Sequence, residues 1–443
     1  MRSSTFQDLL ASIAERGRRV LQRQPGDGTA EGLPGLAQAI VSGRGEASGT
    51  ALAAQLLDGY KHLGYDERLA FFHQLASDFG PDHGRVAAAL AAYEAEPSDA
   101  HAMALHAASE PRRQELLRRL NRAPGGTARL VAMRAELLGL LNERPDLAGV
   151  DEDFEHLLAS WFNRGFLVLN RIDWNTPAAI LERIIQYEAV HEIHSWEDLR
   201  RRIEPGDRRC YGFFHPALVD DPLIFLEVAL TRGTPAAIAP ILAAERTRLA
   251  ADAADTAVFY SISNCQEGLR GISFGNFLIK QVVEELKRDL PDLKTFVTLS
   301  PAPGLKRWLT GLLKEDAAEP VLADEERAAL ARLDDEGWHL GNDAAALKAA
   351  LSPLVAWYFV NARRHDGSPV DAVARFHLGN GARLEQIDWL GDVSARGLGE
   401  AAGFMVNYLY DLKHIEENHE LFVNKRQVVA SSRVMRLARR ASA

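Results

Sequence analysis

Residues 265–280, CQEGLRGISFGNFLIK, contain two overlapping patterns that would support different chemistry. The letters GISFG, which start at Gly271, match the G-x-S-x-G nucleophile elbow of hydrolases, in which Ser273 would attack the substrate. From Arg270 onward, the same letters describe a glycine-containing loop before an amphipathic helix. Such a loop presents backbone NH groups to a phosphate.

The hydrolase pattern conflicts with the position of the preceding strand. A nucleophile elbow places its serine on the sharp turn where the strand ends and the helix begins. Here the predicted strand ends near Ser263, and the segment NCQEGLRG intervenes before Ser273. A serine hydrolase that uses Ser273 therefore stays open only as an alternative.

The phosphate interpretation fits the same residues better. Gly268, Gly271 and Gly275 would let the backbone close on a ligand, and Arg270 would add a cation. A helix that opens near Asn276 would supply further NH groups. The segment lacks the Gly-Lys-Ser/Thr of a Walker loop, and its glycine spacing differs from the dinucleotide fingerprint. We therefore predict an anion-binding loop whose ligand these residues alone do not identify.

The remaining residues that could bind a metal give no convincing set. His191 and His194 would lie one turn apart on a helix, but no third ligand stands at a suitable spacing. Cys210 and Cys265 are far apart and belong to no CxxC pattern. We predict no metal site and no disulfide framework.

Length and composition limit the class of protein. A chain of 443 residues is expected to form two domains, and 47% hydrophobic with 25% charged residues is typical of globular proteins. The net charge of -10 argues against a nucleic-acid binder. No apolar run approaches a membrane span and no secretory signal is visible, so we expect a cytoplasmic protein without membrane segments.

The first part of the chain has the hydrophobic spacing of helices. Leu130, Met133, Leu137 and Leu141 follow one another at intervals of three or four residues, and similar patterns recur on both sides. We predict an all-helical bundle over residues 1–164. Because no catalytic constellation occurs there, we expect it to serve in packing or oligomerisation.

The hydrophobic period changes to two after about residue 205, which predicts strands. A helix over 278–286, ended by Pro291, separates two of them and makes a parallel crossover unit. The segment 265–276 is then the loop at the carboxyl end of the first strand, where open sheets bind ligands. The predicted strands are 222–231, 257–263, 294–300, 372–378 and 382–388.

Three long segments in the same order resemble the malonyl-CoA decarboxylase family. They are FYSISNCQEGLRGISFGNFLIKQVVEEL, FVTLSPAPGLKRWL and RFHLGNGARLEQIDWLGDVSARGLGEAAGFMVNYLYDL. The resemblance implies an α+β chain: a helical domain over 1–164, then a catalytic domain over 165–443 similar to the GCN5-related acetyltransferases. That domain has a mixed β-sheet flanked by helices.

The resemblance also implies a role for the glycine loop. Acetyltransferases bind the pyrophosphate of coenzyme A with a loop of Arg or Gln, two variable residues, Gly, one more residue, and Gly or Ala. Ser273 departs from it, standing where a glycine is usual. The coenzyme-binding residues are expected to be Arg270, Gly271, Ile272, Ser273, Phe274, Gly275 and Asn276.

The same resemblance places the catalytic pair on Ser300 and His377, with Tyr410 in support. By residue type alone, Ser300 would be a turn serine before proline, His377 a strand histidine, and Tyr410 a core aromatic on a helix shared with Tyr408. In the family interpretation, Ser300 engages the malonyl carboxylate and His377 protonates the enolate. The thioester acts as the electron sink, so no cofactor is expected beyond the coenzyme A moiety of the substrate.

The expected ligands are malonyl-CoA and acetyl-CoA, and a homo-oligomer, either a dimer or a tetramer, is expected. Two alternatives beside the hydrolase stay open. An acyl-CoA N-acyltransferase would use the same loop but would need an amine acceptor. A non-catalytic acyl-CoA sensor would bind malonyl-CoA without turning it over.

Overall fold

The computed structural model describes residues 3–22, 32–42, 45–272, 278–314 and 320–440. The chain divides into two compact units, each considered by itself below. The first unit comprises Met1–Val168, Phe214–Leu223 and Cys265–Phe274. The second comprises Leu169–Phe213, Ile224–Asn264 and Gly275–Ala443. The predicted domains, 1–164 and 165–443, and the oligomerisation role of the first, stay predictions.

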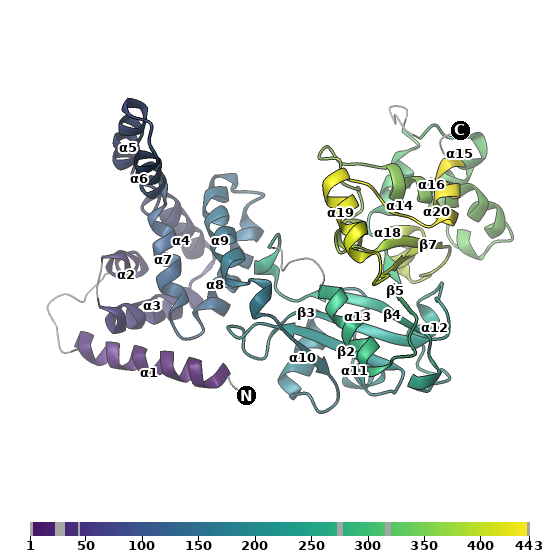
Figure 1. Cartoon of the computed structure of the whole chain (residues 1–443), viewed down its shortest axis with the longest axis horizontal. Coiled ribbons are helices and arrows are strands. Elements are labelled where there is room, and N and C mark those ends of the chain that lie inside the picture. The colour runs from purple at the N-terminus through teal and green to yellow at the C-terminus, as the bar shows by residue number, and fades with distance from the viewer. Residues whose placement is uncertain (1–2, 23–31, 43–44, 273–277, 315–319, 441–443) are drawn as a thin grey trace. The chain divides into compact units, whose positions relative to one another are not determined.

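The first unit is built from helices, as the hydrophobic spacing predicted (Figure 1). Its core uses the expected positions, because Leu130, Met133 and Leu137 are almost completely buried on α8. Leu116 and Leu120 are buried on α7. The helices are α1 (Ser3–Gln22), α2 (Gly32–Val41), α3 (Glu46–Lys61), α4 (Tyr65–Ser77), α5 (His83–Ala95), α6 (Asp99–Ser109), α7 (Arg112–Asn121), α8 (Gly126–Leu140) and α9 (Ala148–Trp161).

A mixed sheet dominates the second unit. Its order is β1-β2-β3-β4-β5-β8-β6, and β7 pairs with β8. The pair β4 and β5 is parallel, whereas β3 with β4 and β5 with β8 are antiparallel. The strands are β1 (Val168–Ile172), β2 (Arg208–Phe214), β3 (Pro222–Thr231), β4 (Thr256–Asn264), β5 (Thr295–Thr298), β6 (Ser300–Pro301), β7 (Arg383–Asp388) and β8 (Met405–Leu409).

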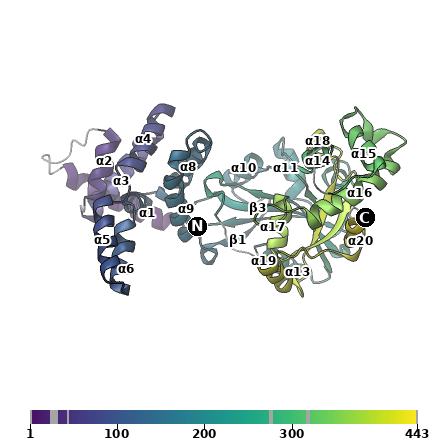
Figure 2. The same cartoon turned by 90° about the horizontal axis from the view of Figure 1, so that it is seen from above.

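Helices flank this sheet, which confirms the predicted fold class of a helical part followed by a mixed sheet with helices. Figure 2 shows α13 and α19 side by side, and an ion pair between Lys280 and Glu416 joins them. The helices are α10 (Ala178–Tyr187), α11 (Trp196–Ile203), α12 (Ala239–Leu242), α13 (Leu278–Asp289), α14 (Leu305–Gly311), α15 (Asp324–Ala331), α16 (Ala344–Asn361), α17 (Ala372–Gly379), α18 (Ala395–Ala401), α19 (Ile415–Lys425) and α20 (Ser432–Arg440).

Strands β4 and β5 stay paired over only part of their length. The parallel register runs from Thr256 opposite Thr295 to Phe259 opposite Thr298. Beyond that point β4 continues to Asn264, whereas β5 has ended. The predicted crossover unit is therefore present. At the carboxyl end of β5, where the pairing with β4 stops, side chains are available for ligand binding.

The predicted strand 372–378 was wrong, because these residues form helix α17. The Asp371 side chain accepts a hydrogen bond from the Ala374 NH at 2.7 Å and caps the helix at its start. The buried residues of this helix are Ala374, His377 and Leu378, which have helical rather than alternating spacing. In so short a segment the capping aspartate decides between helix and strand.

Two other local predictions were also wrong. Tyr408 lies on strand β8, not on a helix, and Tyr410 follows that strand directly. His191 and His194 lie in the connection between α10 and α11, so no helical turn separates them. Among the residues described here, no three His, Cys, Asp or Glu side chains lie close enough together to hold a metal ion.

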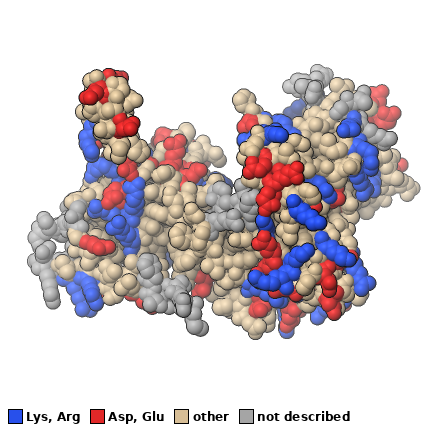
Figure 3. All heavy atoms as spheres, viewed as in Figure 1, with Lys and Arg blue, Asp and Glu red and all other residues tan. Residues whose placement is uncertain are grey.

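Figure 3 shows basic and acidic side chains interspersed over the face that it draws. No helix in the described part of the chain is long and apolar enough to cross a membrane.

Candidate active site

Ser300 lies where the sheet changes from β5 to β6. It pairs with Val406 on β8, and this strand pairing fixes the backbone position of Ser300. Its Oγ donates a hydrogen bond to Thr298 Oγ1 at 2.8 Å. Thr298 Oγ1 also accepts from the NH of Tyr408 at 3.2 Å. The hydroxyl of Ser300 is therefore positioned by two strands.

His377 reaches Ser300 from helix α17. Its Nε2 lies 3.1 Å from the Oγ of Ser300, although 76 residues of sequence separate them. Its ring also stacks on Tyr408, with ring centroids 4.6 Å apart and planes 25° from parallel. One face of the imidazole is thus covered by an aromatic side chain, which fixes the plane of the ring.

Tyr410 completes the arrangement on the other side of the imidazole. Its hydroxyl lies 2.8 Å from His377 Nδ1. The NH of Tyr410 donates to the carbonyl of Phe296 on β5 at 2.8 Å, which anchors the residue just beyond β8. Three residues from different parts of the sequence, Tyr410, His377 and Ser300, therefore form one continuous chain of hydrogen bonds.

Burial sets the protonation state of this chain. His377 is 2% exposed, and loss of hydration lowers its pKa to about 3. Burial also raises the pKa of Tyr410 well above its usual value. At neutral pH the imidazole and the phenol are thus both uncharged. The site can hold and pass a proton between hydroxyl and imidazole groups, and an entering anion would favour protonation of the imidazole.

The first unit contains the described beginning of the predicted coenzyme loop. Gly268 is required there, because a Cβ atom at this position would lie 1.8 Å from the carbonyl oxygen of Val131 on α8. Gly271 has a φ of +86°, which also favours glycine. The predicted residues Ser273, Phe274, Gly275 and Asn276 lie outside the described residues.

A buried arginine in the first unit holds the start of this loop. Arg134 is 1% exposed and donates to the carbonyls of Gly268 and Arg270 at 3.0 and 2.9 Å. Asp151 accepts from Arg134 Nε at 2.7 Å and balances its charge. The side chain of Arg270 is 61% exposed and pairs with Glu267. Arg270 is therefore accessible to an anion, and Ile272 beside it is buried.

Sequence reasoning missed two residues that position these sites. Thr298 stands two residues before Ser300, and alternation along a strand could have predicted that they share a face. Arg134 lies in a helical stretch of the first unit and is far from the loop in sequence. No local pattern indicates that its guanidinium reaches two backbone carbonyls.

Comparison with known proteins shows the family to which the chain belongs. The model of the malonyl-CoA decarboxylase C-terminal domain matches residues 165–443, which is more than half of the chain. The chain belongs to the malonyl-CoA decarboxylase family. The model of the malonyl-CoA decarboxylase N-terminal domain matches residues 79–162. The resemblance seen in the sequence is confirmed, and the family is one of carboxy-lyases.

Individual malonyl-CoA decarboxylases are similar over most of their length. The mitochondrial malonyl-CoA decarboxylase of Anser anser anser is 38% identical over 393 residues, covering 82% of this chain and 78% of that protein. The crystal structure of malonyl-CoA decarboxylase from Rhodopseudomonas palustris has 55% identity and a TM-score of 0.89, covering 92% of this chain and 99% of that one. The Agrobacterium vitis structure gives 55% identity and a TM-score of 0.87, covering 91% and 99%.

Proposed function

We propose that this chain converts malonyl-CoA to acetyl-CoA and carbon dioxide. Membership of the malonyl-CoA decarboxylase family supports the substrate. The observation that carries the catalytic proposal is the buried chain of hydrogen bonds from Tyr410 through His377 to Ser300. This chain places a hydroxyl donor and an imidazole next to each other beside the carboxyl end of β5.

The reaction itself defines what the protein has to supply. The carboxylate of malonyl-CoA is β to a thioester carbonyl, so the carbon–carbon bond can break with its electron pair spreading onto the thioester oxygen. Carbon dioxide leaves, and the resulting enolate takes one proton at the α carbon to give acetyl-CoA. Because the thioester accepts the electrons, no cofactor beyond the coenzyme A moiety is needed. The protein contributes orientation, desolvation and a proton.

Ser300 is proposed to bind the malonyl carboxylate. A serine hydroxyl can rotate, so the proton now donated to Thr298 can turn toward an entering carboxylate. Ser300 is 5% exposed, so its partner would lose much of its hydration. Loss of water destabilises the carboxylate more than it destabilises the transition state, in which the charge has moved toward the thioester, and this lowers the barrier.

His377 is proposed to protonate the enolate. In the free protein its burial favours the neutral form, but a carboxylate bound nearby would raise its pKa and allow uptake of a proton from solvent. In the protonated state both ring nitrogens donate. The oxygens of Tyr410 and Ser300, which lie 2.8 and 3.1 Å away, can both accept. The Nε2 proton is then available to the α carbon, which leaves a neutral imidazole.

Tyr410 is proposed to act through His377. Its hydroxyl contacts Nδ1 and so points Nε2 toward Ser300. Tyr408 supports the same orientation by stacking on the ring. Tyr410 is therefore a positioning residue rather than the proton donor, because burial raises its pKa and would make a phenolate costly.

Coenzyme binding is proposed for the segment that starts at Arg270. Arg270, Gly271 and Ile272 begin this loop, and Arg134 fixes its backbone. The exposed guanidinium of Arg270 would meet the pyrophosphate. The remaining positions of the proposed loop, Ser273, Phe274, Gly275 and Asn276, complete the pattern in the sequence.

A product assay tests the proposal. Purified protein is given malonyl-CoA and no acceptor, and acetyl-CoA, carbon dioxide and free coenzyme A are followed together. We expect acetyl-CoA and carbon dioxide in equal amounts, lost in Ser300→Ala. Ser352→Ala is the matched control, because Ser352 is a serine on α16 whose hydroxyl donates to the carbonyl of Lys348 in its own helix.

Other products would select the alternatives. Free coenzyme A that disappears in Ser273→Ala would indicate the serine hydrolase. Turnover that appears only after addition of an amine would indicate an N-acyltransferase. Binding of malonyl-CoA without any product would indicate a sensor. Each of these outcomes would contradict decarboxylation by Ser300 and His377.

A further inference from the structure

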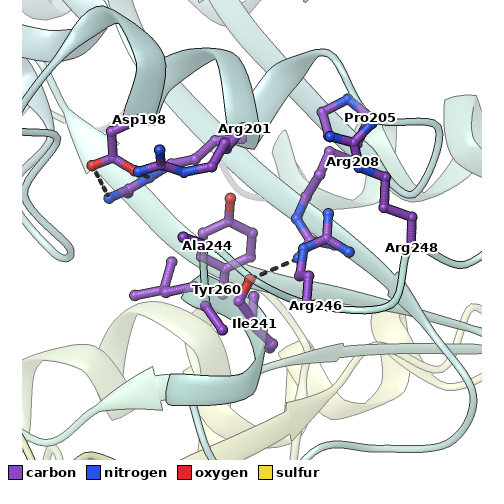
Figure 4. Close-up of a pocket in the computed structure, with 12 residues that line it drawn as sticks. Asp198, Arg201, Pro205, Arg208, Ile241, Ala244, Arg246, Arg248 and Tyr260 are labelled. Carbon is purple, nitrogen blue, oxygen red and sulfur yellow. Dashed lines mark hydrogen bonds and ion pairs between the residues drawn. The ribbon is translucent and has the colours of Figure 1, made fainter.

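A pocket in the second unit gathers arginines around a buried tyrosine. It lies apart in sequence from Ser300, His377 and Tyr410. Its walls come from α11, the start of β2, α12 with the chain that follows it, and β4 (Figure 4). The lining residues with charged or polar side chains are Asp198, Arg201, Arg202, Arg208, Arg246, Arg248 and Tyr260.

The floor of the pocket contains a hydroxyl without a partner. Tyr260 is 2% exposed, and its hydroxyl has no hydrogen-bond partner among the described residues. In Figure 4 this hydroxyl points into the space between Arg201 and Arg208. A buried hydroxyl without a partner costs free energy, so a hydrogen-bond acceptor in the pocket would be favourable. Burial raises the pKa of Tyr260 well above its usual value, so the group stays a neutral donor.

The walls carry more positive than negative charge. Asp198 pairs with Arg201 and Arg202 at 3.3 and 3.2 Å. Glu227, which does not line the pocket, pairs with Arg202 as well, at 3.3 Å.

A further carboxylate, Asp207, pairs with Arg208 at 3.7 Å and with Arg246 at 2.5 Å. The fifth guanidinium, that of Arg248, forms no ion pair with any described residue, although its charge acts on the carboxylate of Glu204, which itself pairs with Arg200. Five guanidinium groups thus face Asp198, Asp207 and Glu227, and burial raises the pKa of Glu227 to about 8, so positive charge exceeds negative charge in the walls.

The shape of the pocket limits what can enter. Its free volume is about 30 Å³, enough for roughly two water molecules, so a base or a pantetheine chain does not fit. Tyr260 and the 4% exposed Arg208 form the closed end. Arg248 is exposed at the open end, and Arg201 beside it is half-buried. A small anion could therefore enter from solvent and reach the Tyr260 hydroxyl. Its oxygens would occupy the space that water molecules would otherwise fill.

We propose that this pocket binds a small tetrahedral oxyanion of the phosphate type, with the Tyr260 hydroxyl and the surrounding guanidinium groups as donors. The several acceptor oxygens of such an anion match donors that converge from different elements, and arginine favours phosphate geometry. The occupant is either free inorganic phosphate or a phosphoryl group of a larger molecule that stays outside. This inference does not depend on the proposed decarboxylation.

The site has a physical connection to the catalytic region. The ring of Tyr260 belongs to a core cluster with Val297, Leu299 and Met405. Leu299 precedes Ser300 directly, and its NH donates to the carbonyl of Phe259, the neighbour of Tyr260, at 2.9 Å. An anion held at Tyr260 would therefore contact a side chain that packs against Leu299, the residue before Ser300.

Calorimetric titration of the full chain with inorganic phosphate, at constant ionic strength with chloride as the balancing ion, tests the proposal. We expect one phosphate bound per chain and a higher melting temperature in its presence. Tyr260→Phe keeps the packing and removes only the hydroxyl. Arg248→Gln removes a guanidinium that no described carboxylate pairs with. Each should weaken phosphate binding about tenfold, the effect of losing one hydrogen bond to a charged group.

Arg288→Gln is the matched control, since Arg288 is an exposed arginine on α13 outside the pocket, and it should bind phosphate like the unchanged chain. Absence of phosphate binding, or binding that neither pocket variant weakens, would overturn the proposal.

A second arm of the experiment identifies the source of the anion. The phosphate titration is repeated with saturating coenzyme A and with its 3′-dephospho form. Unchanged phosphate binding in both would assign free phosphate as the occupant. Phosphate binding that is lost with coenzyme A but kept with the 3′-dephospho form would also support the site, and would assign the ribose phosphate of the coenzyme.

Discussion

The Nε2 atom of His377 lies 3.1 Å from the Oγ atom of Ser300, inside a part of the second unit where both side chains are almost fully buried. The two residues come from different kinds of element, a helix and a strand end. Within the described part of the chain, neither residue has a charged partner that would explain its burial as part of an ion pair. A buried hydroxyl and a neutral imidazole in this contact can accept an anion and move a proton, as the proposed decarboxylation requires.

The contact between Tyr410 and His377 predicts a selective effect of one hydroxyl. Tyr410→Phe removes the partner of Nδ1, and we expect kcat to fall about five- to tenfold, the worth of roughly one neutral hydrogen bond. KM should change little, because Tyr410 acts on the imidazole. Tyr408→Phe is the control, since the Tyr408 hydroxyl has no hydrogen-bond partner among the described residues and its ring is kept. Equal losses in both variants would argue against the positioning role.

The lowered pKa of His377 predicts how stability depends on pH. The unfolded chain takes up a proton at this residue below about pH 6.5, whereas the folded chain does so only below a pKa of about 3. Folding stability should therefore fall as the pH is lowered through this window, by about 2 kcal/mol from pH 6.5 to pH 5. Urea unfolding of the unchanged chain and of His377→Gln measures the difference. The stability of His377→Gln should lack this pH-dependent contribution. The same pH dependence of stability in both proteins would refute the lowered pKa of His377.

The proposed proton donor predicts the shape of the pH–rate profile. kcat reports groups in the enzyme–substrate complex, where His377 must carry the proton that goes to the α carbon. We expect kcat to decrease as pH rises through the pKa of His377 in that complex. The residual activity of His377→Asn should lack this alkaline limb. An unchanged limb in the variant would mean that another group donates the proton.

The close approach of Gly268 to α8 predicts an effect on the coenzyme loop. In Gly268→Ala the added Cβ would lie 1.8 Å from the carbonyl oxygen of Val131, so the loop has to move. We expect a loss of stability of about 1–3 kcal/mol and a higher KM for malonyl-CoA. Gly139→Ala on α8 is the matched control, because open space surrounds that position. Gly139→Ala should leave KM unchanged. An unchanged KM in Gly268→Ala would show that this loop does not take part in coenzyme binding.

Much of the fold follows from local sequence patterns. The leucines of α7 and α8 have helical spacing and are buried as predicted. The strands β3, β4 and β7 occur where the hydrophobic residues alternate or run continuously. These elements are predictable because each one's pattern matches the surface that it buries. Segment 372–378 was assigned wrongly, since the residue that decides it, Asp371, lies just outside the apolar run.

The candidate site was predictable only in part. The family resemblance named Ser300, His377 and Tyr410, but residue types alone favoured a turn serine and a strand histidine. Their proximity depends on how α17 and β8 return to the end of β5, a long-range relationship that no spacing in the sequence encodes. The same reason hides Arg134, which acts on a loop more than one hundred residues later.

The most direct test of the central claim compares acetyl-CoA formation in Ser300→Ala, His377→Asn and the double variant. Because the two residues are proposed to act as one unit, each single change should lower kcat about 100-fold or more. The double variant should lose little beyond the worse single variant. Wild-type rates in both single variants would contradict the account, and losses that multiply in the double variant would show that the two residues act independently.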